Sequence, residues 1–440
     1  MGGAVTAHTP VRSWGLPGPF AHRVLQPASL AEVRLPADDS WLAHGLGRSY
    51  GDVALNAGHT LVCTRWLDRY LAFDAATGVL ECEAGLPLAR LVEDLLPRGW
   101  FPAVVPGTLQ VTVGGAVAND VHGKNHHAMG SFGDHVLGLT LKRSDGSALE
   151  CSPDENPQWF EATVGGLGLT GLITRVRLQL RPVASGWMRV AVQRFRGLDA
   201  FFALNAQAEA KHEYAVAWID CLSGADALRG VLLAGDHADA APDAAPRFPP
   251  PPRRAGVPLT PPFSLVNPLS LRAFNSAYFH RAPDRAELLQ SVWDYFWPLD
   301  RLANWNRIYG PRGLLQYQCV LPPQSAETGV RELLRLLRAA GSGSFLAVLK
   351  TFGARPPRGL LSFARAGLTL ALDFPDTPRV RSLFTQLDAC VAAAGGALYP
   401  AKDAVGSPAL FRSAYPRWGE FQRWRDAGVS SGFARRMEAA

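Results

Sequence analysis

Residues 111–125 of this chain read VTVGGAVANDVHGKN, and they are entered through Pro106-Gly107-Thr108. Glycines and small residues crowd together in this stretch, so few side chains stand between its backbone N–H groups and a ligand. Successive free N–H groups form a concave site for an anion. The stretch therefore predicts a loop that holds a diphosphate.

An earlier segment, residues 45–52, has the same character and reads GLGRSYGD. It adds a guanidinium group at Arg48, hydroxyl groups at Ser49 and Tyr50, and the aromatic ring of Tyr50. Two loops of this kind can clamp one dinucleotide between them.

Length and composition bound the class of protein. A chain of 440 residues that is 48% hydrophobic can bury a large core, and its length favours two domains. Its six cysteines include no C-x-x-C pair, which argues against zinc and a disulfide framework and favours buried thiols. No apolar run reaches the roughly 18 to 20 residues that span a bilayer, and the N-terminus lacks a hydrophobic signal core. We expect a cytoplasmic or peripheral membrane protein.

The net charge of +6 would suit an anionic partner such as a phosphate-bearing lipid, a membrane surface or nucleic acid. Much of the excess is arginine spread along the chain, so a merely solvated surface is an equal alternative. The sequence contains no known nucleic-acid reader motif and no basic helix with base-facing residues. We therefore expect no nucleic-acid binding.

The pattern of residues predicts an α+β protein. Residues 79–83 and 172–180 alternate like half-buried strands, and residues 88–96 place leucines and a valine on one face of a helix that ends near Gly99. Asp145-Gly146 is a strong hairpin signal between two further strands.

The pattern of predicted elements divides the chain into three parts. These are a first domain over residues 1–185, a substrate or cap domain over 186–395, and a C-terminal segment over 396–440 that returns to the first domain. Within the cap, residues 240–262 contain four successive prolines and little that could pack, which predicts a mobile loop. Its composition favours a spacer over a membrane-facing lid.

Three motifs suggest functions that their surroundings in the sequence do not support. Residues 166–171, GLGLTG, match the dinucleotide fingerprint G-x-G-x-x-G, but a strand follows where a helix is required. Gly123-Lys124-Asn125 lacks the remaining residues of a P-loop, so ATP binding is not expected. His122, His126 and His127 lie in glycine-rich sequence without a carboxylate or cysteine cluster, so we expect no metal site.

Taken together, these segments resemble the FAD-dependent oxidases of the vanillyl-alcohol-oxidase type, and within them the branch that acts on a polyprenyl-phosphate-linked ribose. The likeness also includes ATVGGLGLTG at 162–171, WNR at 305–307, LQYQ at 315–318, DFP at 373–375 and YPAKD at 399–403. The resemblance implies a two-subdomain FAD-binding domain of the PCMH type and a cap domain built on an antiparallel sheet with helices.

The resemblance also implies which residues bind FAD. These are Gly45, Leu46, Gly47, Arg48, Ser49, Tyr50, Gly51, Asp52, Gly107, Thr112, Val113, Gly114, Gly115, Asn119, Asp120, Val121, His122, Ile173 and Tyr399. Many relatives have a histidine at the position of Arg48 that bonds covalently to the flavin. Noncovalent FAD is therefore expected here.

For catalysis, the resemblance implies hydride transfer from C2 of the sugar to N5 of the flavin, giving a 2-keto sugar. Lys402 matches the family's active-site lysine and would stabilise negative charge, while His122 and Tyr50 are both candidates to accept the hydroxyl proton, directly or through water. Trp218, Gln316, Gln318, Lys350 and Lys402 match positions that line the substrate cavity. A separate NAD-dependent short-chain reductase would complete an epimerisation to arabinose for the arabinan of the cell wall.

The chain departs from its relatives in four places. Ala371 stands where relatives have a reactive cysteine, Thr369 replaces an asparagine, and Asn119 replaces a cysteine. The segment between Glu32 and Gly45 looks short, which puts the usual first strand in doubt. Two alternatives stay open: an FAD-dependent oxidase of an alditol or aldonolactone, and a flavoprotein subunit without turnover.

Overall fold

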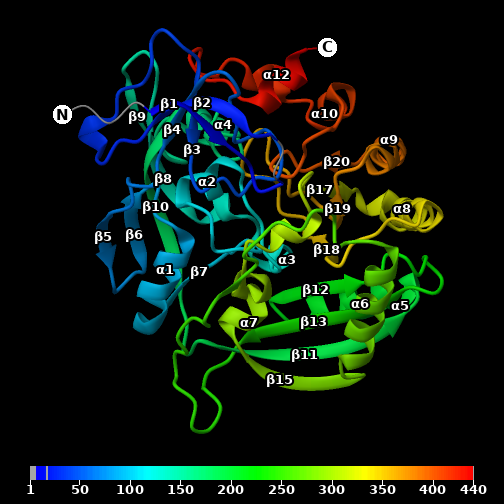
Figure 1. Cartoon of the computed structure of the whole chain (residues 1–440). Helices are drawn as coiled ribbons and strands as arrows, with labels where there is room; N and C mark the ends of the chain where they lie inside the picture. Colours follow the sequence, from blue (N-terminus) through cyan, green and yellow to red (C-terminus); the bar gives the residue numbers. More distant parts are fainter. Residues whose placement is uncertain (1–5, 16–17, 440) are drawn as a thin grey trace.

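The computed structural model describes residues 6–15 and 18–439, which form an α+β fold with three main sheets (Figure 1). The first sheet has four strands in the order β1-β2-β4-β3. The second has the order β5-β6-β10-β8-β9, with β7 also paired to β10, and its pairs are antiparallel. Their bounds are β1 Thr6–Val11, β2 Phe20–Leu25, β3 Trp41–His44, β4 Thr60–Cys63, β5 Tyr70–Asp74, β6 Val79–Glu83, β7 Trp100–Pro102, β8 Val136–Lys142, β9 Ala148–Cys151 and β10 Leu172–Pro182.

The third sheet is antiparallel throughout and has the order β15-β11-β13-β12-β18-β19-β17-β20. Its strands are β11 Trp187–Arg196, β12 Tyr214–Ile219, β13 Arg229–His237, β15 Arg285–Ser291, β17 Leu314–Leu321, β18 Ala347–Phe352, β19 Gly367–Pro375 and β20 Ala397–Leu398. A short parallel pair joins β14 (Ala255–Gly256) to β16 (Leu302–Ala303). The expected α+β class and antiparallel cap sheet are confirmed.

Twelve α-helices lie within the described residues. They are α1 Leu88–Leu95, α2 Val113–Ala118, α3 His126–Met129, α4 Pro157–Thr163, α5 Leu198–Glu209, α6 Pro268–Arg281, α7 Val292–Phe296, α8 Ala326–Ala340, α9 Pro378–Ala393, α10 Pro408–Ala414, α11 Trp418–Phe421 and α12 Gly432–Glu438. In this part of the chain, no helix combines the length and hydropathy needed to cross a membrane.

Local sequence patterns account for several elements. The buried positions of α1 are Leu88, Leu91, Val92 and Leu95, which recur at helical spacing on one face. The helical stretch stops at Gly99, whose φ of 82° suits glycine. The predicted hairpin at Asp145-Gly146 is present between β8 and β9.

Two other expectations concern the first domain. The GLGLTG segment is preceded by α4 and followed by β10, so it lacks the strand–helix setting of a Rossmann fingerprint, as expected. A strand, β3, forms between Glu32 and Gly45, where the short segment puts one in doubt. Trp41 of β3 is fully buried and pairs in parallel with β4.

The large sheet is covered on both faces because its side chains alternate. On β12, Ala215, Ala217 and Ile219 pack in a core with α5, α8 and α9, whereas Trp218 packs in the core that includes the first domain. Every residue of β12 is buried as a result.

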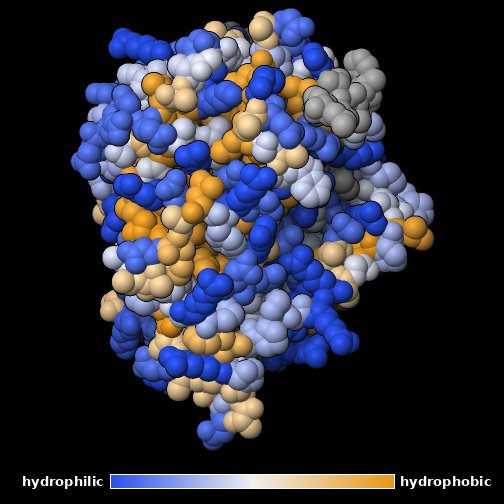
Figure 2. Space-filling model, turned by 90° about the vertical axis from the view of Figure 1, so that its left-hand side faces the viewer, coloured by the Kyte–Doolittle hydropathy of each residue, from blue (hydrophilic) through white to orange (hydrophobic). Residues whose placement is uncertain are grey.

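The proline-rich connection after β13 is tethered at several points. Trp187 Nε1 donates to the Pro246 carbonyl at 2.9 Å, and Trp293 Nε1 donates to the Pro249 carbonyl at 2.8 Å. Its start forms the projection at the bottom of Figure 1, and the same projection lies at the lower end of the face in Figure 2, where hydrophilic and hydrophobic residues are mixed. Tryptophan donors thus hold a segment whose composition predicts little packing, and its mobility stays a prediction.

The C-terminal helices pack beside the first sheet. Phe411 of α10 and Phe433 of α12 are buried in one core with Trp41 and Leu42 of β3. Arg436 of α12 then joins two distant segments through its guanidinium group, pairing with Asp52 at 2.9 Å and Asp403 at 3.1 Å. It also donates to the Gly406 carbonyl at 2.6 Å.

We predict that Arg436→Gln lowers the free energy of unfolding by about 2–3 kcal/mol, because it leaves two partly buried carboxylates without their cation. Urea unfolding followed by tryptophan fluorescence measures the change. The matched control is Arg423→Gln, at an exposed position of the same C-terminal segment, which should be within about 0.5 kcal/mol of the parent. Equal loss in both variants would contradict a specific role for the Arg436 contacts.

Candidate functional site

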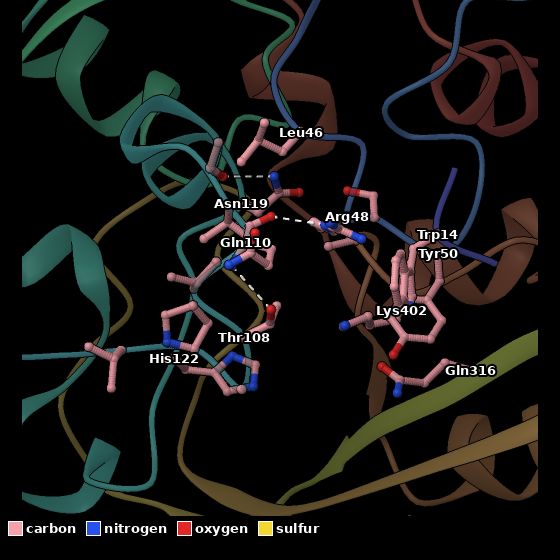
Figure 3. A pocket seen from close by; sticks show the side chains of 18 of the residues that line it. Trp14, Leu46, Arg48, Tyr50, Thr108, Gln110, Asn119, His122, Gln316 and Lys402 are labelled. Carbon is pink, nitrogen blue, oxygen red and sulfur yellow. Dashed lines mark hydrogen bonds between the residues drawn. The ribbon is translucent and has the colours of Figure 1, made fainter. Parts of the chain in front are cut away.

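A cavity of about 530 Å³ opens between the two glycine-rich loops and the large sheet. Its walls come from residues 45–50, from residues 105–124, from the strands of the large sheet and from the segment around Lys402. In Figure 3, Trp14, Tyr50, Lys402 and Gln316 gather on one side of this cavity, and His122 lies on the other.

The two glycine-rich loops contact each other directly. A Cβ at Gly45 would lie 2.6 Å from Thr112 Oγ1, so only glycine permits this approach. Thr112 in turn begins α2, where its hydroxyl oxygen accepts a hydrogen bond from the Gly115 N–H at 3.1 Å. The close packing leaves the backbone of both loops facing the cavity, which fits a diphosphate-bearing cofactor such as FAD.

Most residues expected to bind FAD line the cavity. They are Gly45, Leu46, Gly47, Arg48, Ser49, Tyr50, Gly107, Thr112, Gly114, Gly115, Asn119, Val121, His122, Ile173 and Tyr399. Arg48 lies with its guanidinium carbon 4.2 Å from the centroid of the Trp14 ring and donates from Nε to the Gln110 carbonyl at 3.2 Å.

Four expected FAD ligands lie behind this wall instead. Val113 is fully buried in the hydrophobic core, and Asp52 pairs with Arg436. Asp120 accepts hydrogen bonds from the Gly133 N–H at 2.9 Å and the Ser362 hydroxyl at 2.5 Å. Gly51 packs so closely on the Asp403 carbonyl that a Cβ would lie 1.8 Å from its oxygen. These residues shape the loops, and the structure does not bring them to the cavity surface.

Lys402 and Tyr50 form a close pair at the cavity wall. The Lys402 Nζ atom lies 3.9 Å from the centroid of the Tyr50 ring. Burial lowers the pKa of Lys402 to about 8, an effect that nearby Asp373 opposes. Burial also raises the pKa of Tyr50 well above its usual value, so its phenol keeps its proton.

His122 is held as a neutral imidazole. Its pKa is lowered well below 6.5, first by burial and then by the charge of Lys350. Its Nε2 atom lies 3.0 Å from the Gln318 amide nitrogen, whereas its buried Nδ1 atom has no hydrogen-bond partner among the described residues. An unpaired buried nitrogen at a cavity wall is poised to meet a ligand.

The expected substrate residues all line the cavity. Trp218 is fixed by a 2.9 Å hydrogen bond from Nε1 to the Phe345 carbonyl, and Gln316 donates to Asp373 Oδ1 at 2.5 Å. Burial raises the pKa of Asp373 to about 6. Lys350 donates to the Gly123 carbonyl at 2.9 Å.

The sheet supplies these residues at alternate positions. The lining includes Val216 and Trp218 on β12, Gln316 and Gln318 on β17, Val348 and Lys350 on β18, and Thr369, Ala371 and Asp373 on β19. Side chains two apart on a strand share one face, so a single face of the sheet forms this wall. Two of the four departures named from the resemblance, Thr369 and Ala371, lie in this wall.

Positive charge dominates the wall. Among the described lining residues, the cations are Arg48, Lys124, Arg254, Lys350 and Lys402, and the carboxylates are Asp300 and Asp373. Burial lowers the pKa of both Lys124 and Lys350 to about 7. An anionic ligand would relieve this imbalance.

Sequence reasoning gave no role to three further lining residues. Trp14 lies under Arg48, and Lys124 contacts the Tyr295 carbonyl. Asp300 accepts hydrogen bonds from the Thr108 hydroxyl at 2.7 Å and from the Leu109 N–H at 2.8 Å. It therefore joins the cap to the second glycine-rich loop, residues 106–125. Lys124 stands in the Gly123-Lys124-Asn125 segment, which the sequence presents only as an incomplete P-loop, whereas Trp14 and Asp300 stand in no local motif.

The other histidines of the loop have separate surroundings. His126 Nδ1 accepts from the Gly353 N–H at 3.1 Å, and His127 Nε2 lies 3.0 Å from the His212 carbonyl oxygen. Across residues 6–15 and 18–439, no group of three or more His, Cys, Asp or Glu side chains could hold a metal ion.

Comparison with known proteins agrees with this geometry. Residues 27–152 match the family described as an FAD binding domain. The chain is 34% identical to the decaprenylphosphoryl-β-D-ribose oxidase of Mycolicibacterium smegmatis over 90% of this chain and 89% of the relative. It is 36% identical to an uncharacterized protein of Streptomyces coelicolor, over 78% of this chain and 95% of that protein. The L-gulonolactone oxidase of Mus musculus is 32% identical, over 36% of this chain and 37% of the relative.

The buried lysines predict how stability depends on pH in the ligand-free protein. Lys124, Lys350 and Lys402 have folded-state pKa values of about 7, 7 and 8, against 10.5 when exposed. Between pH 6.5 and 8.5 the unfolded chain therefore binds more protons, and stability rises with pH, by roughly 2 kcal/mol or more. Buried Cys82 and Cys221, whose pKa values rise to about 12, oppose the trend above this range.

Urea unfolding of FAD-free protein at three pH values within that range provides the measurement. Replacement of Lys124 by Met should flatten the rise, whereas replacement of exposed Lys211 by Met should leave it unchanged. A stability that falls steadily from pH 6.5 to 8.5 would contradict the desolvation of these lysines.

Proposed function

Because this chain belongs to the family of FAD-dependent oxidases that includes decaprenylphosphoryl-β-D-ribose oxidase, we propose that it oxidises a secondary hydroxyl of a polyprenyl-phosphate-linked pentose. The chain is an FAD-dependent oxidoreductase. The observation that carries the narrower proposal is the meeting of Tyr50, His122, Gln318 and Lys402, from four separate segments, at one positively charged cavity.

The loops fit FAD for two reasons. Gly45 and Gly114 pack so closely on Thr112 and Ala84 that a Cβ would collide there, and within the described residues Asn119 Oδ1 and His122 Nδ1 are buried without hydrogen-bond partners. Bound FAD would supply a hydride acceptor at its N5 atom. Residues 45–50 and 112–119 would hold its diphosphate, with Arg48 adding positive charge.

The remaining residues handle charge and the proton. Lys402 is held as an ammonium ion below pH 8, so it can stabilise negative charge that develops at the cavity wall. His122 suits the task of proton acceptor better than Tyr50, because the Tyr50 phenol retains its own proton. The Gln318 amide N–H donates to His122 Nε2, so the neutral ring carries its proton on Nδ1, and Nε2 could accept the substrate proton only once this hydrogen bond opens.

The substrate assignment rests on charge and on the extent of the similarity. Among the described residues no carboxylate pairs with the half-buried Lys124 or Lys350, which suits the phosphate of a lipid-linked sugar. We further propose that the 2-keto product passes to an NAD-dependent short-chain reductase, which would complete an epimerisation to arabinose for cell-wall arabinan.

One alternative has specific support. Relatives include an L-gulonolactone oxidase and a putative D-arabinono-1,4-lactone oxidase, although each matches less than half of this chain. A free alditol or aldonolactone would bind in the same cavity without needing the two unpaired lysines. A flavoprotein without turnover would bind FAD that no sugar reduces.

We expect FAD to be bound noncovalently, because Arg48 cannot form the flavin bond that a histidine makes at this position in relatives. Acid or heat denaturation followed by centrifugation should release essentially all of the flavin absorbance into the supernatant. A precipitate that stays yellow after washing would contradict this prediction.

We expect anaerobic addition of the polyprenyl-phosphate pentose to bleach the flavin, and free alditols or lactones to leave it oxidised. Lys402→Ala should give a folded yellow protein whose flavin is reduced about 100-fold more slowly or worse, because a positioned cation is lost. Stopped-flow absorbance measures the rate, and exposed Lys211→Ala is the matched control. Normal reduction in Lys402→Ala would remove this residue from the mechanism.

A further inference from the structure

Large apolar side chains are exposed mainly in one part of the described chain. Nine of twelve such residues lie between positions 259 and 302. Seven of them form what we call the mouth patch: Leu259, Phe263, Leu265, Leu269, Phe274, Tyr278 and Leu302. Leu259 and Leu269 are each 78% exposed and Phe263 is 67% exposed, so these side chains have no cover within the protein.

The patch is built on an ordered framework. Helix α6 turns Leu271, Asn275 and Phe279 inward, and the Asn275 amide donates to Asp220 Oδ1 at 2.8 Å. Val266 and Leu271 pack in a small core with Trp305 and Tyr309. The outward apolar residues are therefore presented by a folded surface.

The patch borders the cavity. Tyr278 and Leu302 belong both to the patch and to the cavity lining. The Tyr278 ring lies 4.6 Å from that of Trp218, between centroids, and 5.9 Å from that of Phe274. The Val257 N–H donates to the Ala303 carbonyl, and the Leu265 N–H donates to the Ile308 carbonyl. These bonds join the loop that carries Leu259, Phe263 and Leu265 to the segment that follows Leu302.

Basic residues accompany the apolar ones. Residues 253–312 contain eight arginines and four carboxylates. Arg253, Arg272 and Arg281 are exposed, and none forms an ion pair with another described residue. Of the carboxylates, Asp294 pairs with Arg301 and Asp300 is bound to the second loop. This region thus carries much of the excess positive charge of the chain.

We propose that the mouth patch docks on an anionic lipid bilayer, so that the cavity opens at the membrane surface. Leucine and phenylalanine side chains with arginines around them form the usual composition of an interfacial membrane contact. Arginine can keep its charged head among lipid phosphates while its stem covers apolar surface. The core of a protein–protein interface, by contrast, is depleted in charge and closely packed, whereas these side chains project from an irregular loop, a helix and a two-residue strand.

Docking would explain how a lipid-linked sugar reaches the cavity. The polyprenyl tail can stay in the bilayer while the phosphate and sugar enter, which avoids exposure of its methylene groups to water. This link to the substrate rests on the proposed function, whereas docking itself does not.

The test is flotation of the FAD-loaded protein with vesicles of phosphatidylcholine alone or with about one third phosphatidylglycerol. We expect binding to the anionic vesicles, and less binding as salt is added. The double variant Phe263→Ser/Leu269→Ser should partition at least about tenfold less. The matched control, Trp66→Ser/Leu71→Ser, removes two exposed apolar residues remote in sequence from the mouth and should bind like the parent.

Three outcomes would overturn the proposal: no vesicle binding by the parent protein, equal loss in the control variant, or a dimer that dissociates in the patch variant without any vesicle binding. The last outcome, seen by sedimentation, would assign the patch to a second copy of the chain. Flavin absorbance and thermal unfolding of each variant, expected to match the parent, show that folding is intact.

A kinetic comparison separates docking from the proposed chemistry. The patch variant should have at least about tenfold higher KM for a long-chain polyprenyl-phosphate sugar in vesicles, with unchanged kcat, and normal KM for a short water-soluble analogue. Equal KM changes for both substrates would overturn the docking role. Failure of the parent protein to oxidise either substrate would overturn the proposed function. The vesicle-binding result would still decide the docking proposal independently.

Discussion

The architecture depends on one contact, that between the first glycine-rich loop and the segment around Lys402. The Tyr50 N–H donates to the Ala401 carbonyl at 3.0 Å, and the absence of a side chain at Gly51 lets its backbone meet that of Asp403. Arg436 then binds a carboxylate on each side of the contact. Segments about 350 positions apart in the sequence are thereby joined, and the Tyr50–Lys402 pair follows from that junction.

Desolvation gives the resulting cavity its chemical character. Three lysines lie half-buried at its wall, and desolvation lowers their pKa values toward neutrality because the protein provides little compensating negative charge. The same burial keeps His122 neutral and the Tyr50 phenol protonated. Burial therefore gives these groups pKa values that differ from those of exposed residues. A ligand that brings negative charge would meet positive groups already held in place.

Short-range pattern predicted much of the fold. The strand at 79–83, the helix ending at Gly99 and the hairpin at Asp145-Gly146 depend on neighbours in sequence, and the structure has all three. The family resemblance pointed to residues that the structure gathers at one cavity, among them His122 and Lys402. Local pattern could not show that Val113 and Asp120 face inward, because both loop surfaces are rich in small residues. It also could not find Asp300, whose partners lie about 190 positions away.

The alternation of the large sheet has a consequence for how specificity can diversify. Positions 369, 371 and 373 face the cavity, whereas the alternating residues Leu368, Leu370 and Leu372 pack under the helices. Residues that face the cavity can therefore be substituted during evolution while the hydrophobic core on the other face of the sheet stays intact. Ala371 presents only a methyl group at one such position, so a reagent that needs a thiol there would find no target.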